Sequence, residues 1–204
     1  TYIINHAENK YLFIDLTFVE LVESLEESLE GVEGFIILTD KDNMPETKLK
    51  NVICYEELIK EESEEFSWPD FDENTASSLC YTSGTTGNPK GVLYSHRSTI
   101  LHTWIVSSGN VAKVSSSSSI LPVVPMFHVN AWGIPYAGAM FGAKLVFPGP
   151  ALDGASIYEL IESEKPDLLM GVPTVWLGLL QYLNETNNTL ESVDTALVLS
   201  LIHI

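Results

Sequence analysis

The sequence predicts an α/β fold, a multi-layer domain with mainly parallel sheets and crossover helices, and three observations support this prediction. Short apolar runs alternate with helical patterns along most of the chain, as they do in βαβ units. The chain has 204 residues and is 45% hydrophobic, so it can bury a sizeable core. A loop rich in glycine and hydroxyl groups follows one apolar run and precedes a helical pattern, and its composition is that of a phosphate loop.

The first part of the chain, residues 1–75, begins with a β-α-β pattern. Residues 11–14 and 35–38 are apolar runs that predict two strands. The helix between them is expected to bury one face, because apolar residues recur at helical spacing with glutamates opposite; these are Leu21, Val22, Leu25 and Leu29. An acidic segment, 55–65, predicts a short helix, and residues 64–74 predict an exposed linker.

The part that follows the loop continues the alternation. A helix is expected over 98–106, with Ile100, Trp104 and Ile105 as core contacts. The later elements are expected in this order: a strand over 120–125, a helix over 131–141, a strand over 144–147, a helix over 156–164, a strand over 168–171 and a helix over 174–183. Ligands of open α/β sheets bind at the carboxyl ends of strands, so His128, just after the first of these strands, is a candidate site residue.

The charge of the chain is strongly negative and unevenly distributed. The formal net charge is -18, and residues 1–75 hold 20 of the 28 acidic residues but only 5 of the 10 Lys and Arg. Such a chain is not expected to bind nucleic acid, whose phosphates are drawn to basic surfaces. Solvation explains the acidic residues better than metal binding, because no EF-hand spacing occurs among them.

Cysteine usage and hydropathy indicate a cytoplasmic protein. Cys54 and Cys80 stand far apart without a CxxC pattern, so neither a zinc site nor a disulfide framework is expected. The longest apolar stretch, residues 131–143, is too short and too rich in glycine to span a bilayer. The chain starts at Thr1 rather than at methionine, and we therefore expect a piece of a longer protein.

Residues 81–91 read YTSGTTGNPKG and are the most informative stretch of the chain. Three glycines, Gly84, Gly87 and Gly91, allow the backbone to bend and to approach an anion closely. Hydroxyl groups and one cation surround them; these are Thr82, Ser83, Thr85, Thr86 and Lys90. The P-loop of nucleotide triphosphatases needs glycine before its lysine and Ser or Thr after it. Pro89 and Gly91 occupy those positions, so a kinase or GTPase is not indicated.

This loop resembles the signature loop of the adenylate-forming superfamily, which includes acyl-CoA synthetases, luciferases and peptide-synthetase adenylation domains. VVPMFHVNAWG at 123–133 resembles the second core motif of that superfamily, and GVPTVW at 171–176 resembles a third. The segment PMFHVNAWGIPYAG, which is followed by GAKLVFPGP, resembles the corresponding segment of fatty acyl-CoA synthetases of the medium- and long-chain type. The resemblance implies that residues 1–204 are part of the large N-terminal AMP-binding domain. Its expected parts are an acidic portion with a linker (1–75), an ATP- and acyl-binding portion (76–194) and an atypical end (195–204).

The resemblance also implies roles for individual residues. Thr82 would be a Mg²⁺ ligand, and the ATP phosphates would be surrounded by Ser83, Gly84, Thr85, Thr86, Gly87 and Lys90. His128 would lie near the reacting carboxylate, and Val129 and Trp132 would line the adenylate and acyl pocket. By itself, a histidine between two apolar residues is more often a packed core residue than a catalytic one. A pocket wall and plain core both stay open for Trp132, whereas core is favoured for Trp176.

The activity implied by the resemblance is ATP-dependent activation of a fatty acid to an acyl-adenylate, followed by transfer to coenzyme A. The expected partners are ATP, Mg²⁺, the acid and coenzyme A, and a homodimer of the full-length protein is left open. Residues 195–204 lack the glycine turn of the family, and its tyrosine-glycine-threonine-glutamate motif and small C-terminal domain are absent. We therefore expect a fragment that cannot complete catalysis alone. The alternatives are a ligase for another acid, such as a short thioether or aryl acid, and a non-catalytic module that binds ATP or an acyl group.

Overall fold

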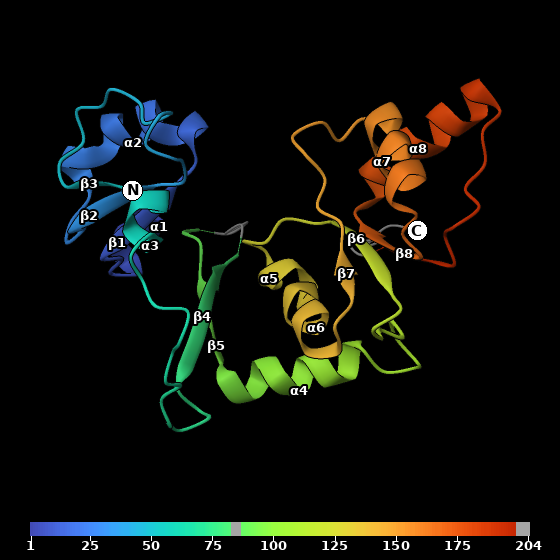
Figure 1. Cartoon of the computed structure of the whole chain (residues 1–204), viewed down its shortest axis with the longest axis horizontal. Helices are drawn as coiled ribbons and strands as arrows, with labels where there is room; N and C mark the ends of the chain where they lie inside the picture. The colour runs from blue at the N-terminus through green and yellow to red at the C-terminus, as the bar shows by residue number, and fades with distance from the viewer. Residues whose placement is uncertain (83–86, 199–204) are drawn as a thin grey trace. The chain divides into compact units, whose positions relative to one another are not determined.

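The computed structural model describes residues 1–82 and 87–198, and its contacts divide them into two units (Figure 1). The first unit contains residues 1–71 and 87–91, and the second contains residues 72–82 and 92–198. The chain passes from the first to the second unit within the segment 64–74, which the sequence marks as a linker.

The first unit is built on a parallel sheet. Its elements follow one another as α1 (Tyr2–His6), β1 (Tyr11–Ile14), the 3₁₀ turn η1 (Leu16–Phe18), α2 (Val19–Leu25), the 3₁₀ turn η2 (Glu26–Ser28), β2 (Gly34–Ile37), β3 (Val52–Cys54) and α3 (Tyr55–Ile59). Within the described residues the strands lie in the order β1-β2-β3, and both pairs are parallel. Ile14 pairs with Ile37, and Ile37 pairs with Cys54. The β-α-β prediction for this part is confirmed.

The buried face predicted for helix α2 is confirmed for Val22, and Leu29, just beyond the helix, packs against the same core cluster, but the prediction is wrong for Leu21. Val19 and Val22 are buried against the sheet, but Leu21 is 56% exposed. The reason is geometric: α2 ends at Leu25, so only about two turns exist, and residues three apart face the sheet while Leu21 points elsewhere. The predicted acidic helix is also shorter than expected, because α3 ends at Ile59. Strand β3 was not predicted, since three residues carry no readable alternation.

The second unit contains a two-stranded sheet and a larger parallel sheet with helices between its strands. Its elements are β4 (Ala76–Tyr81), β5 (Gly91–Ser95), α4 (His96–Val106), β6 (Ser119–Val123), α5 (Val129–Trp132), α6 (Ile134–Phe141), β7 (Lys144–Leu145), α7 (Gly154–Glu164), β8 (Leu168–Gly171), α8 (Pro173–Thr186) and β9 (Thr195–Val198). Strands β4 and β5 pair with each other. In the described chain the larger sheet has the order β7-β6-β8-β9, and each neighbouring pair is parallel.

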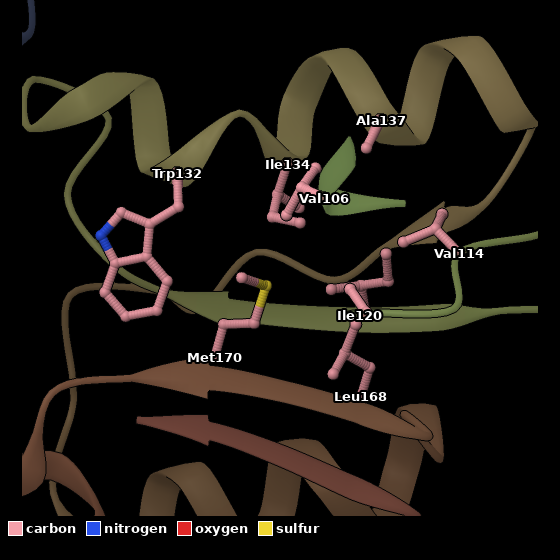
Figure 2. Packing of buried hydrophobic residues seen from close by; sticks show 9 residues of the cluster. Val106, Val114, Ile120, Trp132, Ile134, Ala137, Leu168 and Met170 are labelled. Atoms are coloured by element: carbon pink, nitrogen blue, oxygen red, sulfur yellow. The ribbon is translucent and has the colours of Figure 1, made fainter. Parts of the chain in front are cut away.

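The larger sheet is buried on both faces, which makes this part of the molecule three-layered. Ile120 of β6 packs into a cluster with residues of α4 and α6, whereas the next residue, Leu121, packs into a cluster with residues of α7 and α8. Successive side chains of a strand point to opposite faces, so each central strand contributes to both clusters. Figure 2 shows the α4 and α6 side, where Ile134 and Ala137 lie above the sheet. The predicted α/β fold with mainly parallel sheets and crossover helices is confirmed.

The core contacts predicted for α4 are wrong. Ile100, Trp104 and Ile105 are 45%, 58% and 65% exposed, and the buried residues of this helix are Thr103 and Val106. Apolar residues are spread around the whole helix, so its sequence does not select one face, and packing against α6 does. Thr103 tolerates burial because its hydroxyl donates a hydrogen bond of 2.7 Å to the carbonyl of residue 99, one turn earlier.

The sequence does not predict strand β5, because the strand begins at Gly91, the last residue of the glycine-rich segment 81–91. It leads directly into α4 through Ser95, whose hydroxyl accepts a hydrogen bond from the backbone N–H of Ser98. The side chain of Ser98 accepts in return from the backbone N–H of Ser95, and the pair forms a capping box. The start of α4 is therefore defined by local side chains.

We expect Gly154→Ala to destabilise the second unit, because α7 and α8 approach each other closely at this glycine. An added Cβ would lie 2.3 Å from the carbonyl oxygen of Gly178 and 2.9 Å from the Cβ of Tyr182. The expected loss in the free energy of unfolding is about 1–3 kcal/mol, measured by denaturant titration. Gly109→Ala is the matched control, since an added Cβ there meets nothing within 4 Å. Equal stability of the two variants would contradict the close approach.

Candidate functional site

The candidate site begins with a run of exposed residues just after the carboxyl end of β6. Met126, Phe127 and His128 follow the strand, and all three side chains are exposed. The backbone turns here, because the N–H of His128 donates to the carbonyl of Pro125 at 3.2 Å. His128 thus stands after a central strand of a parallel sheet, where ligands of such sheets commonly bind.

The segment after His128 has an unusual backbone. Val129, Asn130, Ala131 and Trp132 have φ angles of 50°, 50°, 49° and 58°, and Gly133 continues with 79°. They form a left-handed turn, the conformation that places Cβ too close to the following carbonyl and costs about 1–2 kcal/mol per non-glycine residue. Glycine is the residue suited to the last position, where an added Cβ would also lie 2.7 Å from the ring of His102. Such a conformation persists only when surrounding contacts hold it.

Three hydrogen bonds connect this left-handed turn to the rest of the unit. The side-chain amide of Asn130 donates to Ser78 Oγ at 2.9 Å, and the thiol of Cys80 donates to Asn130 Oδ1 at 3.2 Å. On the other side, Nε2 of His102 in α4 lies 3.0 Å from the carbonyl oxygen of Trp132. Strand β4 and helix α4 therefore both hold the turn.

A cavity of about 220 Å³ lies beside the left-handed turn. Its lining residues are Tyr94, Ser98, Thr99, His102, Val129, Asn130, Gly133 and Tyr136. Val129, which the resemblance places in an acyl pocket, is among them. His102 and Tyr136 were not predicted from the sequence. A signal existed for His102, because Ser98, Thr99 and His102 form a polar stripe at helical spacing on α4.

A second cavity, of about 570 Å³, lies at the carboxyl ends of β6 and β8. It is lined by Pro122, Val123, Val124, Pro125, Met126, Phe147, Pro148, Gly149, Leu152, Val172 and Val175. These side chains are almost all apolar, and its volume is within the range of about 300–1,000 Å³ typical of ligand pockets. The second and third sequence motifs, which contain residues 123–126 and 172–175, contribute to this one cavity.

The predicted phosphate loop is only partly within the described residues. Thr82 follows β4 directly and is exposed, and Gly87 and Lys90 are exposed as well. Gly87 has a φ angle of 148°, which residues with a Cβ rarely adopt, so its backbone requires glycine. Ser83, Gly84, Thr85 and Thr86 lie outside the described residues. Within residues 1–82 and 87–198, His, Cys, Asp and Glu side chains form no group of three that could hold a metal ion. The roles assigned to these loop residues stay predictions.

Trp132 and Trp176 are both buried, on opposite faces of the larger sheet. Trp132 is 8% exposed and packs with Ile134, Met170 and their neighbours, as Figure 2 shows. Trp176 is 9% exposed and belongs to the cluster of α7 and α8. Neither tryptophan lines the two cavities described above. The pocket role of Trp132 stays a prediction.

Comparisons with known proteins give consistent results. A family model described as "AMP-binding enzyme" matches residues 1–200. The medium-chain-fatty-acid–CoA ligase of Ectopseudomonas oleovorans is 54% identical over 180 residues, which are 88% of this chain and 33% of that protein. The 3-methylmercaptopropionyl-CoA ligase of Ruegeria lacuscaerulensis is 48% identical, over 97% of this chain and 36% of the relative. The long-chain-fatty-acid–CoA ligase of Thermus thermophilus is 44% identical, over 97% of this chain and 35% of the relative. The chain thus spans about a third of the length of these relatives.

Solved structures share the fold at lower sequence identity. The anthranilate CoA ligase AuaEII in complex with anthranoyl-AMP superimposes with a TM-score of 0.78 at 22% identity, over 97% of this chain and 37% of that one. A long-chain-fatty-acid-CoA ligase of Archaeoglobus fulgidus gives a TM-score of 0.76 at 24% identity, over 92% of this chain and 35% of that one. Among the residues that the structure describes, no helix is both long enough and apolar enough to cross a membrane.

Proposed function

The chain belongs to the AMP-binding enzyme family, and from this premise we propose that it is part of an ATP-dependent acid–CoA ligase. The enzyme would activate a medium- or long-chain fatty acid to an acyl-adenylate, release pyrophosphate and pass the acyl group to coenzyme A. The observation that carries this proposal is the connection between two motifs. Strand β4, which leads into the predicted phosphate loop, is hydrogen-bonded through Asn130 to the turn that follows His128.

The chemistry of adenylation explains why these two regions are joined. The acid and the triphosphate are both anions, so they repel each other until cations neutralise the phosphates. Lys90 would supply one positive charge. Mg²⁺, when bound, would neutralise the phosphates further, and Thr82 is an exposed residue whose hydroxyl is a hard oxygen donor of the kind that this ion prefers. A carboxylic acid is already ionised near neutral pH, so His128 would orient the carboxylate rather than remove a proton from it.

The cavity beside the left-handed turn is the proposed site of the acyl chain. Val129, Gly133 and Tyr136 line it, and Val129 is the immediate neighbour of His128. Its volume is about 220 Å³. A short thioether acid is the second candidate substrate, because a relative at 48% identity is named a 3-methylmercaptopropionyl-CoA ligase.

An acid panel tests the proposal on the full-length protein that carries these residues. Acid-dependent exchange of labelled pyrophosphate into ATP is measured with saturated acids of increasing length, 3-methylmercaptopropionate and an aryl acid. We expect the highest kcat/KM for a medium-chain acid. A maximum for the thioether acid would select the second candidate. Nucleotide binding without exchange for any acid would contradict ligase activity and favour a non-catalytic binding module.

A further inference from the structure

We propose that Asn130 is a positioning residue for adenylation, which holds the left-handed turn after His128 against the strand that leads into the phosphate loop. This inference rests on the proposed function. The resemblance implies roles for the neighbouring residues His128, Val129 and Trp132 but none for Asn130.

The side-chain amide of Asn130 is matched on both of its polar atoms. Its Nδ2 donates to the hydroxyl of Ser78, and its Oδ1 accepts from the thiol of Cys80. Ser78 and Cys80 are two residues apart on β4 and therefore point to the same face of that strand. A side chain that accepts at one atom and donates at the other suits this pair of partners. We call this arrangement the β4 clamp.

The clamp acts on a backbone that would not hold its conformation by itself. Asparagine accepts the left-handed region more readily than most residues with a Cβ, but Val129 and Ala131 on either side do not. Val129 is β-branched, and a positive φ at such a residue is an outlier. Because Asn130 lies in the middle of the turn, its two hydrogen bonds anchor the strained segment at its centre.

The position of the clamp links the two halves of the proposed reaction. Cys80 precedes Thr82, the predicted Mg²⁺ ligand, by two residues, and Asn130 follows His128 by two residues. A shift of the left-handed turn would therefore move the acid side of the site relative to the phosphate side. Misplacement of reacting groups by about 1 Å costs on the order of 100-fold in rate. We expect loss of the clamp to lower kcat while leaving the KM for ATP nearly unchanged.

Three substitutions separate the clamp from the backbone preference of asparagine. Asn130→Ala removes the clamp and keeps the backbone strain, and Asn130→Gly removes the clamp but relieves the strain. Asn130→Asp keeps an acceptor for both the thiol and the hydroxyl of β4. Asn187→Ala is the matched control, because Asn187 also has a positive φ, 54°, at the end of α8, and it lies outside the site.

The first measurement does not depend on activity. Cys80 is 8% exposed and its thiol is bonded to Asn130, so its alkylation by iodoacetamide reports the clamp. Labelling is followed by peptide mass spectrometry in the full-length protein, with Cys54 as internal reference. We expect labelling of Cys80 to accelerate about tenfold in Asn130→Ala and Asn130→Gly, as loss of one hydrogen bond implies. Labelling in Asn130→Asp and Asn187→Ala should stay near the wild-type rate. Unchanged labelling in Asn130→Gly would overturn the clamp.

The second measurement is pyrophosphate exchange with the best acid of the panel. We expect kcat to fall about 100-fold in both Asn130→Ala and Asn130→Gly, with little change in the KM for ATP or in Asn187→Ala. A kcat near wild type in Asn130→Gly would overturn the positioning role, because only the backbone conformation would then matter. An inactive wild-type protein would contradict the ligase proposal instead, while Cys80 labelling still decides whether the clamp exists.

Discussion

Lys90→Ala is expected to slow acid-dependent pyrophosphate exchange about 100-fold or more, comparable to the loss of one preorganised donor at a developing charge. The physical reason is the charge balance of the loop. Lys90 is the single cationic residue of the segment 81–91, and the chain as a whole has a formal net charge of -18. Its removal would leave the anionic phosphates to be neutralised by the metal ion and by hydroxyl and backbone donors.

Lys90→Arg and Lys113→Ala are the controls for this prediction. Arginine keeps the charge but replaces a compact ammonium by a planar group, so exchange should recover only in part. Lys113 is exposed and lies outside the loop in sequence, and its replacement should leave exchange within about twofold of wild type, as for surface positions in general. Exchange in Lys90→Ala at the wild-type rate would remove the phosphate role from this lysine.

Trp132→Ala is expected to lower the free energy of unfolding by about 3–5 kcal/mol, the usual cost of truncating a buried tryptophan. Its side chain packs against Ile134 and Met170 on one face of the parallel sheet. The same substitution tests the pocket role implied by the resemblance. If Trp132 also borders the acyl site in the full-length enzyme, the variant should prefer acids of a different chain length.

Trp176→Ala is the matched variant, because Trp176 is equally buried but packs on the opposite face of the sheet. Both variants should lose stability by denaturant titration. If only Trp132→Ala changes the preference for acid chain length, the pocket role is supported. If the two variants show the same chain-length preference as each other, Trp132 is assigned to the core only. Unaltered stability of Trp132→Ala would contradict the packing shown in Figure 2.

Helices α7 and α8 of the second unit were predictable because they are long enough for their periodicity to be read, and the apolar run between them predicted a buried strand. Residues 168–171 were predicted and found as a strand, and the helices expected over 156–164 and 174–183 correspond to α7 and α8. The candidate site residues were identified from the sequence motifs that resemble the family, rather than from hydrophobic periodicity. The short strand β3 and the buried face of α4 were missed, because neither has a distinctive pattern of its own.

By itself the sequence determined the alternation of strands and helices, the family, and the loop whose glycines and hydroxyls suit an anion, because these depend on neighbours within a few residues. Only the tertiary structure decided that Asn130 meets Ser78 and Cys80, about 50 positions earlier, and that His102 reaches the carbonyl of Trp132. Hydrophobic spacing indicates that a face is buried but not what it packs against. A contact between distant residues depends on the path of the whole chain between them.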